Sequence, residues 1–397
     1  KYGSKDRRFI SETLFSIFRW WGWLRYLYDV SENILKRQLT DVHHYDPWLR
    51  ICFAAHLLDT EVLNPAALQW KEWLKMEGFM TSMGDRSLEE KAEILTHEFR
   101  LKSPQPVQLT PSWILDSLPL EGDDVMLFME VLQKRPPMWL RAQTDDMGFL
   151  LRDLRGHGLD ATRHDRMKRA ICVNNPRVNL YDLQSFKDGL FEVQDLASQV
   201  IGEICAPQPG ERWWDACAGA GGKTLQLASM MKSKGSVLAT DIRDYKLEDL
   251  RKRARRPGLS NIRTKGWDGK MLPSKTQFDG VLVDAPCSNT GTWRRNPDAR
   301  WTLTPDAVTD IAAIQAEVIR TCAKGVKPGG KLIYATCSLA REENEAIIES
   351  FLKDFPEFTL TPVPHPATGA ETNGMMRTWP FDGDCDGMFV ALMTKKA

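Results

Sequence analysis

The alternation of strand and helix patterns after Glu211 is the feature that most restricts how this chain can fold. Short apolar runs are separated by longer segments with helical periodicity, an order typical of a parallel sheet covered by helices on both faces. The strands are predicted at residues 212–216, 236–240, 261–264, 278–283, 331–335, 358–363 and 388–394. The helices between them are predicted to begin near Gly222, Asp244, Pro305 and Arg341. This pattern predicts an α/β domain with a doubly wound, seven-stranded sheet.

Two different patterns precede this domain. From Asp6 to about Phe99, apolar residues recur at three- and four-residue steps, which predicts helices whose aromatic side chains fill a core. Closely spaced prolines at 103–106 favour extended chain, so we predict an all-α domain over residues 1–105. An extended segment at 139–142 and a helix around 146–156 predict a small α+β domain over 106–195, followed by the main domain over 196–397.

Charge and cysteine content restrict the partners and the compartment. The 53 basic and 53 acidic residues cancel, so any nucleic acid must bind to local basic patches. The eight cysteines include no C-x-x-C pair, which argues against a zinc site and against a disulfide framework. Charged residues interrupt the apolar segment 9–28, which argues against a signal peptide or a membrane span. We therefore expect a cytoplasmic monomer without a metal ion.

A glycine-rich turn follows the first predicted strand, at residues 217–224. It is not a P-loop, because Cys217 occupies the position of that motif's first glycine, and Thr224 breaks the dinucleotide fingerprint G-x-G-x-x-G. The turn still allows a ligand to approach the backbone closely. Asp241 and Asp268 follow the second and third strands, where an acid can bind ribose hydroxyls. Because this layout suits a nucleoside without phosphate, it predicts S-adenosylmethionine.

Two Cys-Ser pairs follow the fourth and fifth strands, at Cys287 and Cys337. These strands should be neighbours in a doubly wound sheet, where ligands bind beyond the carboxyl ends, so both thiols should face one crevice. A reducing compartment disfavours a disulfide, and two sulfurs alone make a poor metal site. The remaining cysteines are expected to be structural. They are Cys52, Cys172, Cys205, Cys217, Cys322 and Cys385.

A thiol beside a methyl donor suits one reaction particularly well. Carbon five of cytosine becomes nucleophilic when a thiolate adds to carbon six, and a second acid or base group then helps to release the product. Asp284 is placed to hydrogen-bond the ring nitrogen or the exocyclic amine and so to stabilise the adduct. These considerations leave open which of Cys287 and Cys337 attacks.

Four motifs together resemble those of the RNA (cytosine-5) methyltransferases of the Nop/Sun family. They are Asp284-Ala285-Pro286-Cys287-Ser288, Ala335-Thr336-Cys337-Ser338, Phe191-x-Val193-Gln194-Asp195-x-Ala197-Ser198 and Cys217-x-x-x-Gly221-Gly222-Lys223-Thr224. Residues 7–20 resemble the antitermination-factor-like helical domain of the bacterial ribosomal-RNA members, and residues 135–141 resemble the start of their small RNA-binding domain. The resemblance implies a Rossmann-like, S-adenosylmethionine-dependent methyltransferase domain preceded by two RNA-binding domains.

The resemblance also implies roles for single residues. Cys337 would be the nucleophile, Cys287 would assist release, and Asp284 would complete the catalytic group. The implied cofactor residues are Cys217, Ala218, Gly219, Gly221, Gly222, Lys223, Asp241, Arg243, Lys246, Asp268 and Asp284. Ribosomal RNA is the preferred substrate and transfer RNA the next, while a non-catalytic RNA-binding scaffold and a methyltransferase for DNA or protein are rival hypotheses.

The loop after Cys287 is predicted to contact RNA, because arginines pair with phosphates and Trp293 or Trp301 could stack on bases. The arginines concerned are Arg294, Arg295 and Arg300. A second basic cluster at 251–256 is either an RNA contact or a solvated helix face. The chain departs from the family pattern at Asn289, where glycine is usual, and at Ala220, where proline is frequent. Both departures could alter the loops near the site.

Overall fold

The structure is a computed structural model that describes residues 3–35, 47–59, 65–73, 82–174 and 178–397. Contacts divide the chain into two compact units. The first contains Lys1–Arg135 and Trp293–Leu303, and the second contains Pro136–Thr292 and Thr304–Ala397. The small and the large sheet thus share the second unit, and the three-domain division stays a prediction.

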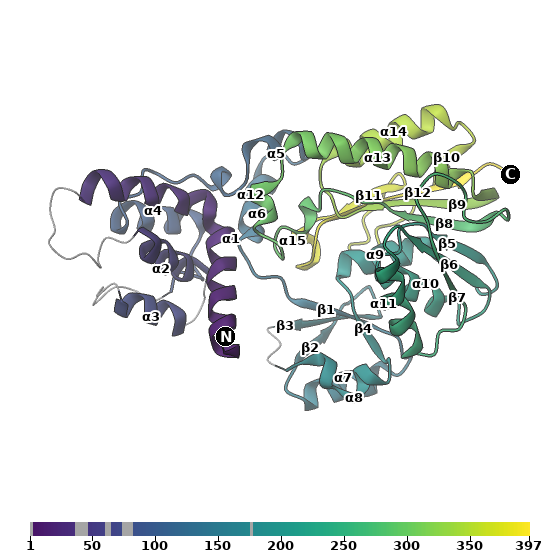
Figure 1. The fold of residues 1–397 in the computed structure, drawn as a ribbon, viewed down its shortest axis with the longest axis horizontal. Helices are drawn as coiled ribbons and strands as arrows, with labels where there is room; N and C mark the ends of the chain where they lie inside the picture. Colours follow the sequence, from purple (N-terminus) through teal and green to yellow (C-terminus); the bar gives the residue numbers. More distant parts are fainter. Residues whose placement is uncertain (1–2, 36–46, 60–64, 74–81, 175–177) are drawn as a thin grey trace. The chain divides into compact units, whose positions relative to one another are not determined.

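The first unit is helical in its described part, as predicted (Figure 1). Its helices are α1 (Ser4–Leu35), α2 (Pro47–Asp59), α3 (Pro65–Trp73), α4 (Leu88–Glu98), α5 (Ser112–Ser117), α6 (Asp123–Leu132) and α12 (Ala299–Thr302), with a 3₁₀ turn η2 (Pro106–Leu109). Trp20, Trp23, Phe53 and Phe99 are buried among them, so the aromatic residues fill the core as expected. The buried carboxylate of Asp59 joins α2 to α1 by an ion pair with Arg19.

The large sheet of the second unit contains all seven predicted strands and one more. The strands are β5 (Arg212–Asp215), β6 (Ser236–Asp241), β7 (Ile262–Gly266), β8 (Phe278–Asp284), β9 (Val326–Thr336), β10 (Phe358–Leu360), β11 (Met375–Thr378) and β12 (Met388–Lys395). Their order is β10-β12-β9-β8-β5-β6-β7, with β11 paired to β12. The five strands from β9 to β7 run parallel, and β12 is antiparallel to β9. The predicted doubly wound arrangement is therefore confirmed.

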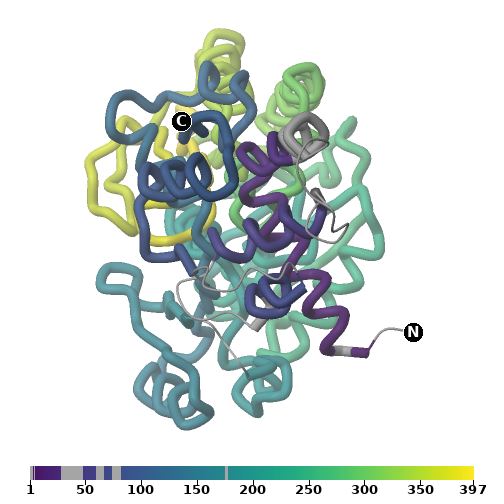
Figure 2. The backbone as a smooth tube through the Cα atoms, turned by 90° about the vertical axis from the view of Figure 1, so that its left-hand side faces the viewer, coloured from purple at the N-terminus to yellow at the C-terminus, as the bar shows by residue number. Residues whose placement is uncertain are grey.

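Two of these strands differ from the prediction. β10 ends at Leu360, two residues before Pro362, which has no N–H for a sheet bond. β11 was not predicted because its four residues follow a segment rich in turn-forming residues, and its pairing partner lies further along the chain, as in Met376 opposite Val390. The chain segment that contains β11 and β12 is drawn in yellow in Figure 2, and β12 ends two residues before the C-terminal Ala397.

Helices cover both faces of the large sheet. α9 (Leu196–Cys205) and α10 (Gly222–Met230) pack on one face, while α13 (Pro305–Ala323) and α14 (Glu345–Asp354) pack on the other. The neighbouring residues Leu282 and Val283 of β8 point into opposite cores, as the two-residue period of a strand requires. α11 (Asp244–Arg255) follows β6, and a short α15 (Pro380–Gly383) precedes β12.

The predicted helix starts at Gly222, Asp244 and Pro305 are confirmed. The start near Arg341 is displaced, because a 3₁₀ turn η5 (Arg341–Glu343) comes first and α14 begins at Glu345.

The small sheet precedes the large one in the second unit. It contains β1 (Met138–Ala142), β2 (Asp160–Arg163), β3 (Ala170–Asn174) and β4 (Phe191–Val193), in the order β2-β3-β1-β4 with antiparallel pairing. α7 (Met147–Gly156), η3 (Leu180–Asp182) and α8 (Gln184–Lys187) complete this region, whose own core includes Leu140, Leu154 and Phe191. The predicted extended segment and helix are both present.

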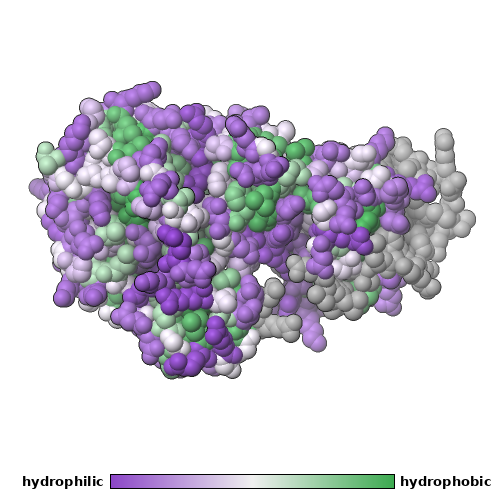
Figure 3. All heavy atoms as spheres, turned by 180° about the vertical axis from the view of Figure 1, so that it is seen from behind, coloured by the Kyte–Doolittle hydropathy of each residue, from purple (hydrophilic) through white to green (hydrophobic). Residues whose placement is uncertain are grey.

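Hydrophilic residues occupy much of the face in Figure 3, with apolar patches between them. Among the described residues, no helix is both long and apolar enough to cross a membrane. Even α1, with 32 residues, carries too many charged residues for that.

Candidate active site

The two Cys-Ser pairs meet at one edge of the large sheet. β8 and β9 are parallel neighbours, with Asp284 opposite Ala335 near their carboxyl ends. The Sγ atoms of Cys287 and Cys337, a few residues further on, lie 3.2 Å apart. The topology thus brings the two thiols together, as the sequence predicted.

A buried carboxylate, which the sequence analysis missed, holds both loops. Glu343 is 0% exposed and accepts hydrogen bonds from the hydroxyls of Ser288 and Ser338, the residues that follow the two cysteines. It also accepts from the backbone N–H of Ser288 at 2.8 Å and from the side-chain amide of Gln315 at 2.9 Å. The repeated serine was the available signal, but the sequence could not identify its acceptor, since three glutamates lie between 342 and 345.

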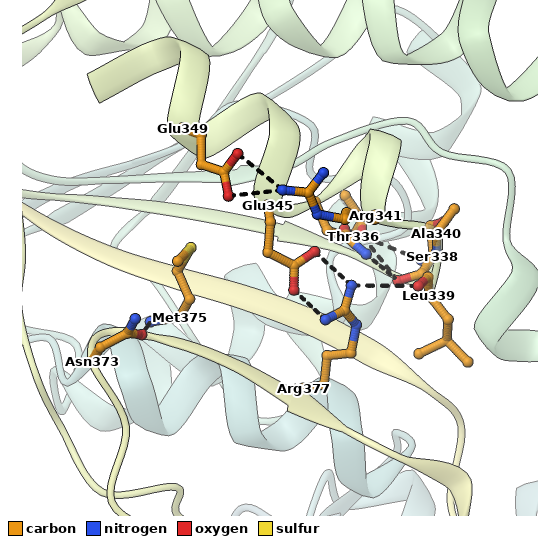
Figure 4. A network of polar contacts seen from close by, with 11 residues as sticks. Thr336, Ser338, Leu339, Ala340, Arg341, Glu345, Glu349, Asn373, Met375 and Arg377 are labelled. Atoms are coloured by element: carbon orange, nitrogen blue, oxygen red, sulfur yellow. Dashed lines mark hydrogen bonds and ion pairs between the residues drawn. The ribbon is translucent and has the colours of Figure 1, made fainter. Parts of the chain in front are cut away.

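Further contacts fix the loop that follows Cys337. The Ser338 N–H donates to Thr336 Oγ1 at 3.2 Å, which closes a tight turn after β9. Arg377 of β11 donates to the carbonyl of Leu339 at 3.4 Å and pairs with both oxygens of Glu345 (Figure 4). The missed strand β11 therefore supports the Cys337 loop from the side of the C-terminal strands.

Asn289 has a left-handed backbone with a φ of +60°. This conformation favours glycine, and asparagine tolerates it better than most other residues. The departure from the family's glycine therefore leaves the loop geometry intact. It also places an amide at the thiols, since Cys337 Sγ donates to Asn289 Oδ1 at 3.0 Å and Cys287 Sγ lies 3.8 Å from the same oxygen.

An ion pair lies beside the thiols. Lys223 Nζ of α10 is 2.7 Å from Asp284 Oδ2 at the end of β8, and the lysine is almost fully buried. Burial opposes the charge of Lys223, but the attraction and hydrogen bond of Asp284 outweigh it and raise the pKa of the lysine. Attraction between the Lys223 ammonium and Cys337 acts in the same direction. The ammonium is thus charged and lies within electrostatic reach of the Cys337 sulfur.

The hydrogen bond with Cys337 and, after it, burial raise the pKa of Cys287 well above its usual value. The negative charge of Glu343 contributes in the same direction. Cys287 therefore keeps its proton near neutral pH.

The glycine-rich turn leads from β5 into α10. Gly219 and Gly221 have φ angles of +53° and +88°, in the left-handed region. A Cβ atom at Gly221 would lie 2.4 Å from Leu250 Cγ, so only glycine fits there. A Cβ at Gly222 would meet nothing within 4 Å, which leaves the backbone at the start of α10 open to a ligand.

The acids predicted to bind a nucleoside differ in their surroundings. Asp241 accepts from the N–H groups of Gly219 at 2.8 Å and Arg243 at 2.9 Å, and also pairs with the Arg243 side chain. Burial opposes ionisation of Asp241, but the hydrogen bonds from Arg243 and Gly219 outweigh it and lower its pKa. Asp268 is exposed in the turn after β7, where it accepts from the N–H of Lys270.

The other predicted cofactor residues lie along the same turn and the following helix. Ala218 donates its N–H to the carbonyl of Thr240, which ties the turn to β6. Cys217 is half-buried next to it. Lys246 lies in the first turns of α11, with its Nζ 5.4 Å from the ring centre of Tyr245. The structure therefore joins the glycine turn, Asp241 and Arg243 by direct hydrogen bonds, and the cofactor roles of Lys246 and Asp268 stay predictions.

Asp215, at the end of β5, has a carboxylate that needs another donor. Thr224 Oγ1 donates to its Oδ2 at 2.6 Å, while its buried Oδ1 has no partner among the described residues. Burial raises the pKa of Asp215 to about 7. A buried carboxylate oxygen without a partner is uncommon and commonly marks a place for a ligand or water. The residues around the glycine turn thus fit a positively charged nucleoside donor such as S-adenosylmethionine.

The predicted RNA contacts of Arg294 and Arg300 are wrong. Both lie in Trp293–Leu303, which belongs to the first unit, and they are 1% and 0% exposed. Arg300 donates to the backbone carbonyls of Arg19, Leu109 and Leu132 at 3.3, 2.8 and 3.2 Å. These arginines hold backbone rather than phosphate.

The other predictions for this segment have mixed outcomes. Trp293 is fully buried and cannot stack on a base, and Trp301 donates its indole N–H to the carbonyl of Phe18 at 2.7 Å. Arg294 donates to the carbonyl of Lys134. Arg295 is only half-buried, so its predicted role stays a prediction.

The basic cluster of α11 is partly internal. Arg253 and Arg256 both pair with Glu192 of β4, which is buried. Arg253 also donates to the carbonyl of Ala220 in the glycine turn at 2.8 Å. For these two arginines, neither a solvated face nor an RNA contact describes the observed role. Through Glu192 and the carbonyl of Ala220, Arg253 joins the small sheet to the glycine turn. Its hydrogen bond also fixes the backbone at Ala220, the position where proline is frequent in the family.

The sheet order and the site together define a Rossmann-like methyltransferase fold. A solved structure titled as that of PH0851 aligns with a TM-score of 0.75 at 28% identity and covers 99% of this chain and 91% of that one. A methyltransferase homolog protein from Pyrococcus horikoshii aligns with a TM-score of 0.61 at 26% identity and covers 72% of this chain and 95% of that one.

Sequence comparison identifies the family. The family model described as 16S rRNA methyltransferase RsmB/F matches residues 203–394. Ribosomal RNA small subunit methyltransferase B of Salmonella arizonae is 30% identical over 415 residues, which cover 100% of this chain and 92% of the relative. The chain belongs to this family of ribosomal-RNA methyltransferases, and the resemblance to the Nop/Sun enzymes is confirmed. The protein is an RNA methyltransferase.

Proposed function

We propose that the protein methylates carbon five of a cytosine in ribosomal RNA through a covalent adduct between a cysteine and carbon six. The observation that carries the proposal is the thiol pair of Cys287 and Cys337, 3.2 Å apart beside the ion pair of Lys223 and Asp284. The names of the relatives support ribosomal RNA as the substrate.

Cys337 is the nucleophile in this proposal. Its thiolate forms a bond to carbon six, and the electron pair of the ring double bond moves to carbon five, which can then attack a methyl group. The raised pKa of Cys287 supports this assignment, because a thiol that holds its proton more firmly is the weaker nucleophile. S-adenosylmethionine supplies the methyl group when it is bound.

Asp284 and Cys287 complete the reaction. Asp284 lies at the end of β8, where its carboxylate can accept a hydrogen bond from the exocyclic amine of the base. Release of the product transfers the proton on carbon five to a base such as water, and the electron pair of that C–H bond reforms the ring double bond and expels the Cys337 sulfur as a thiolate. The Cys287 thiol can donate a hydrogen bond to that departing sulfur. The target base must be unpaired or extruded, because stacking hides carbon six.

The cofactor would be held at the glycine turn. The open backbone at Gly222, the carboxylate of Asp241 and the unpartnered oxygen of Asp215 support this placement. The helical first unit and the small sheet are proposed to bind RNA. On the small sheet, the exposed side chains of Arg163, Arg166 and Lys168 support this role.

Adduct trapping tests the proposal directly. Wild type, Cys337→Ala, Cys287→Ala and the double variant are incubated with S-adenosylmethionine and small-subunit ribosomal RNA, both free and in assembled particles, and resolved on a denaturing gel. Cys287→Ala should retain a covalent RNA-protein band, and the double variant should lose it. Sequencing of the trapped RNA would then identify the cytosine.

Other outcomes would contradict parts of the proposal. A band in Cys337→Ala but not in Cys287→Ala would reverse the two roles. Methylation of carbon five that survives the loss of Cys337 would exclude the covalent mechanism. Absence of both adduct and methyl transfer with every RNA sample would reject the proposed substrate.

A further inference from the structure

Asn289 is the polar side chain that contacts both thiols. Its Oδ1 lies 3.0 Å from Cys337 Sγ and 3.8 Å from Cys287 Sγ. The residue belongs to the loop of Cys287, yet its shorter contact is to the sulfur of the other loop. The amide therefore spans the two strand ends at the point where the proposed chemistry takes place.

The backbone of this residue separates the role of its side chain from the role of its conformation. At a φ of +60°, glycine adopts the same backbone without strain, and aspartate also tolerates the left-handed region. Replacement by either residue should therefore preserve the loop. Any change in the reactivity of the thiols can then be assigned to the side chain. The glycine variant loses the amide, and the aspartate variant replaces it with a negative charge.

A nucleophilic sulfur needs different partners before and after it loses its proton. A thiol donates a hydrogen bond, as Cys337 does to Asn289 Oδ1, whereas a thiolate can only accept. A side-chain amide carries an acceptor oxygen and a donor nitrogen, which exchange places when the amide turns by half a rotation. An amide can therefore serve both forms, whereas a carboxylate can serve only the thiol.

Charged groups around the two sulfurs come from several elements. Lys223 of α10 attracts negative charge at Cys337, while Asp284 at the end of β8 partly neutralises that lysine. Glu343, behind the serines, acts against negative charge at Cys287. The thiol of Cys287 lies 3.2 Å from the Cys337 sulfur, where it can also donate a hydrogen bond. Charges of both signs therefore lie near the Cys337 sulfur. A neutral hydrogen-bond donor in direct contact with this sulfur would stabilise its thiolate form by an amount that depends little on the balance of those charges.

We propose that Asn289 is a positioning residue whose amide holds the Cys337 sulfur in both its thiol and its thiolate form. This inference rests on the proposed role of Cys337 as the nucleophile. It assigns a function to a residue at which this chain departs from the glycine of the family pattern.

Thiol alkylation tests the inference without RNA or cofactor. The full chain and its Asn289→Asp and Asn289→Gly variants are treated with iodoacetamide from pH 6 to 10, and modification of the Cys337 peptide is followed by mass spectrometry. Asn289→Asp places a negative charge beside the sulfur and should lower the rate at pH 7 about tenfold, with the half-maximal pH about one unit higher. Asn289→Gly removes the amide without adding a charge and should lower the rate about threefold. The Cys52 peptide, from the first unit, serves as the internal reference and should not change.

Two results would overturn the inference. One is a pH profile of Cys337 in Asn289→Asp that equals the wild-type profile. The other is faster alkylation in Asn289→Gly, which would show that the amide suppresses the thiolate. Unchanged unfolding midpoints of both variants would confirm that the loop is intact. Because alkylation does not require methyl transfer, the result is distinct from failure of the trapping experiment.

Discussion

Each of the two units contains a buried charge that is held mainly by neutral groups. In the second unit, Glu343 accepts from two serine hydroxyls, a backbone N–H and an amide. In the first unit, Arg300 donates to three backbone carbonyls. Glu343 joins the loops of the two thiols, and Arg300 joins three segments of the helical unit. A single charged side chain can thus fix several loops when each partner supplies one hydrogen bond.

The comparison also shows that nearness in sequence to a proposed catalytic residue does not predict function. Arg300 lies only 13 positions after Cys287, yet it is buried in the first unit. Glu343 lies six positions after Cys337 and directs its side chain back to both cysteine loops. The surroundings of each charge, rather than its place in the chain, decide its role.

Removal of the buried carboxylate should have the largest effect. Glu343→Ala leaves four donors in a buried site without their acceptor, at a cost of about 5 kcal/mol of the free energy of unfolding. Because the spacing of the thiols depends on this carboxylate, methyl transfer should fall by about 100-fold or more. Urea unfolding and single-turnover assays measure the two effects.

Glu317→Ala is the matched control for this prediction, since Glu317 is exposed on α13. Its free energy of unfolding should change by less than about 0.5 kcal/mol. A Glu343→Ala variant as stable and as active as the control would show that the serines hold the thiol loops without the carboxylate.

Asp215 is a buried carboxyl group whose Oδ1 has no hydrogen-bond partner among the described residues. Its contribution to the free energy of unfolding should depend on pH. Its pKa rises from an ordinary value of 3.8 to about 7, so between these values the folded chain retains a proton that the unfolded chain has lost. The free energy of unfolding should therefore fall with rising pH in this window. Above pH 7 the full cost is at most about 4 kcal/mol, at about 1.4 kcal/mol per pKa unit.

Asp215→Asn removes this titration and keeps an acceptor for Thr224. The variant should match wild type near pH 4 and exceed it in stability at pH 8. Chemical unfolding at a series of pH values measures the difference. A constant difference across the range would mean that Asp215 is charged throughout.

Arg300→Ala should destabilise the first unit by about 3 kcal/mol, because three buried carbonyls lose their donors. Burial lowers the pKa of Arg300 to about 9, so the wild-type side chain still carries its charge at neutral pH. Hydrogen exchange should increase in the described part of α1, α6 and the residues around Leu109. The control is Arg8→Ala, which removes an exposed pair with Glu12 and should cost less than about 0.5 kcal/mol. Equal effects of the two substitutions would contradict the role assigned to Arg300.

Two ion pairs that involve glutamates of α14 should give the smallest effects on the free energy of unfolding. Arg377 and Glu345 are largely buried, whereas Arg341 and Glu349 are about half exposed (Figure 4). Arg377→Ala should cost about 2 kcal/mol, and Arg341→Ala at most about 0.5 kcal/mol. Thermal unfolding of the two variants measures the difference. If Arg341→Ala were the more destabilising change, burial would not be the factor that separates the pairs.

Much of the fold could be predicted because its signals are local. All seven predicted strands and three of the four helix starts were correct, since apolar periodicity and turn residues act over a few positions. β11 was missed because a short strand depends on its distant partner β12. The turn at Arg341–Glu343 was predicted as helix because nothing in its local pattern indicates that Glu343 turns inward.

The sequence by itself determined the doubly wound class of the sheet, the glycine turn and the meeting of Cys287 with Cys337. These follow from strand periodicity and from the rule that neighbouring parallel strands end at one edge. Only the tertiary structure decided that Glu343 binds both serines, that Asn289 reaches the thiols and that Arg300 is buried. Each of these side chains makes at least one contact with a segment far away in the chain, and hydrogen-bond partners at such separations are selected by packing, which local composition does not encode.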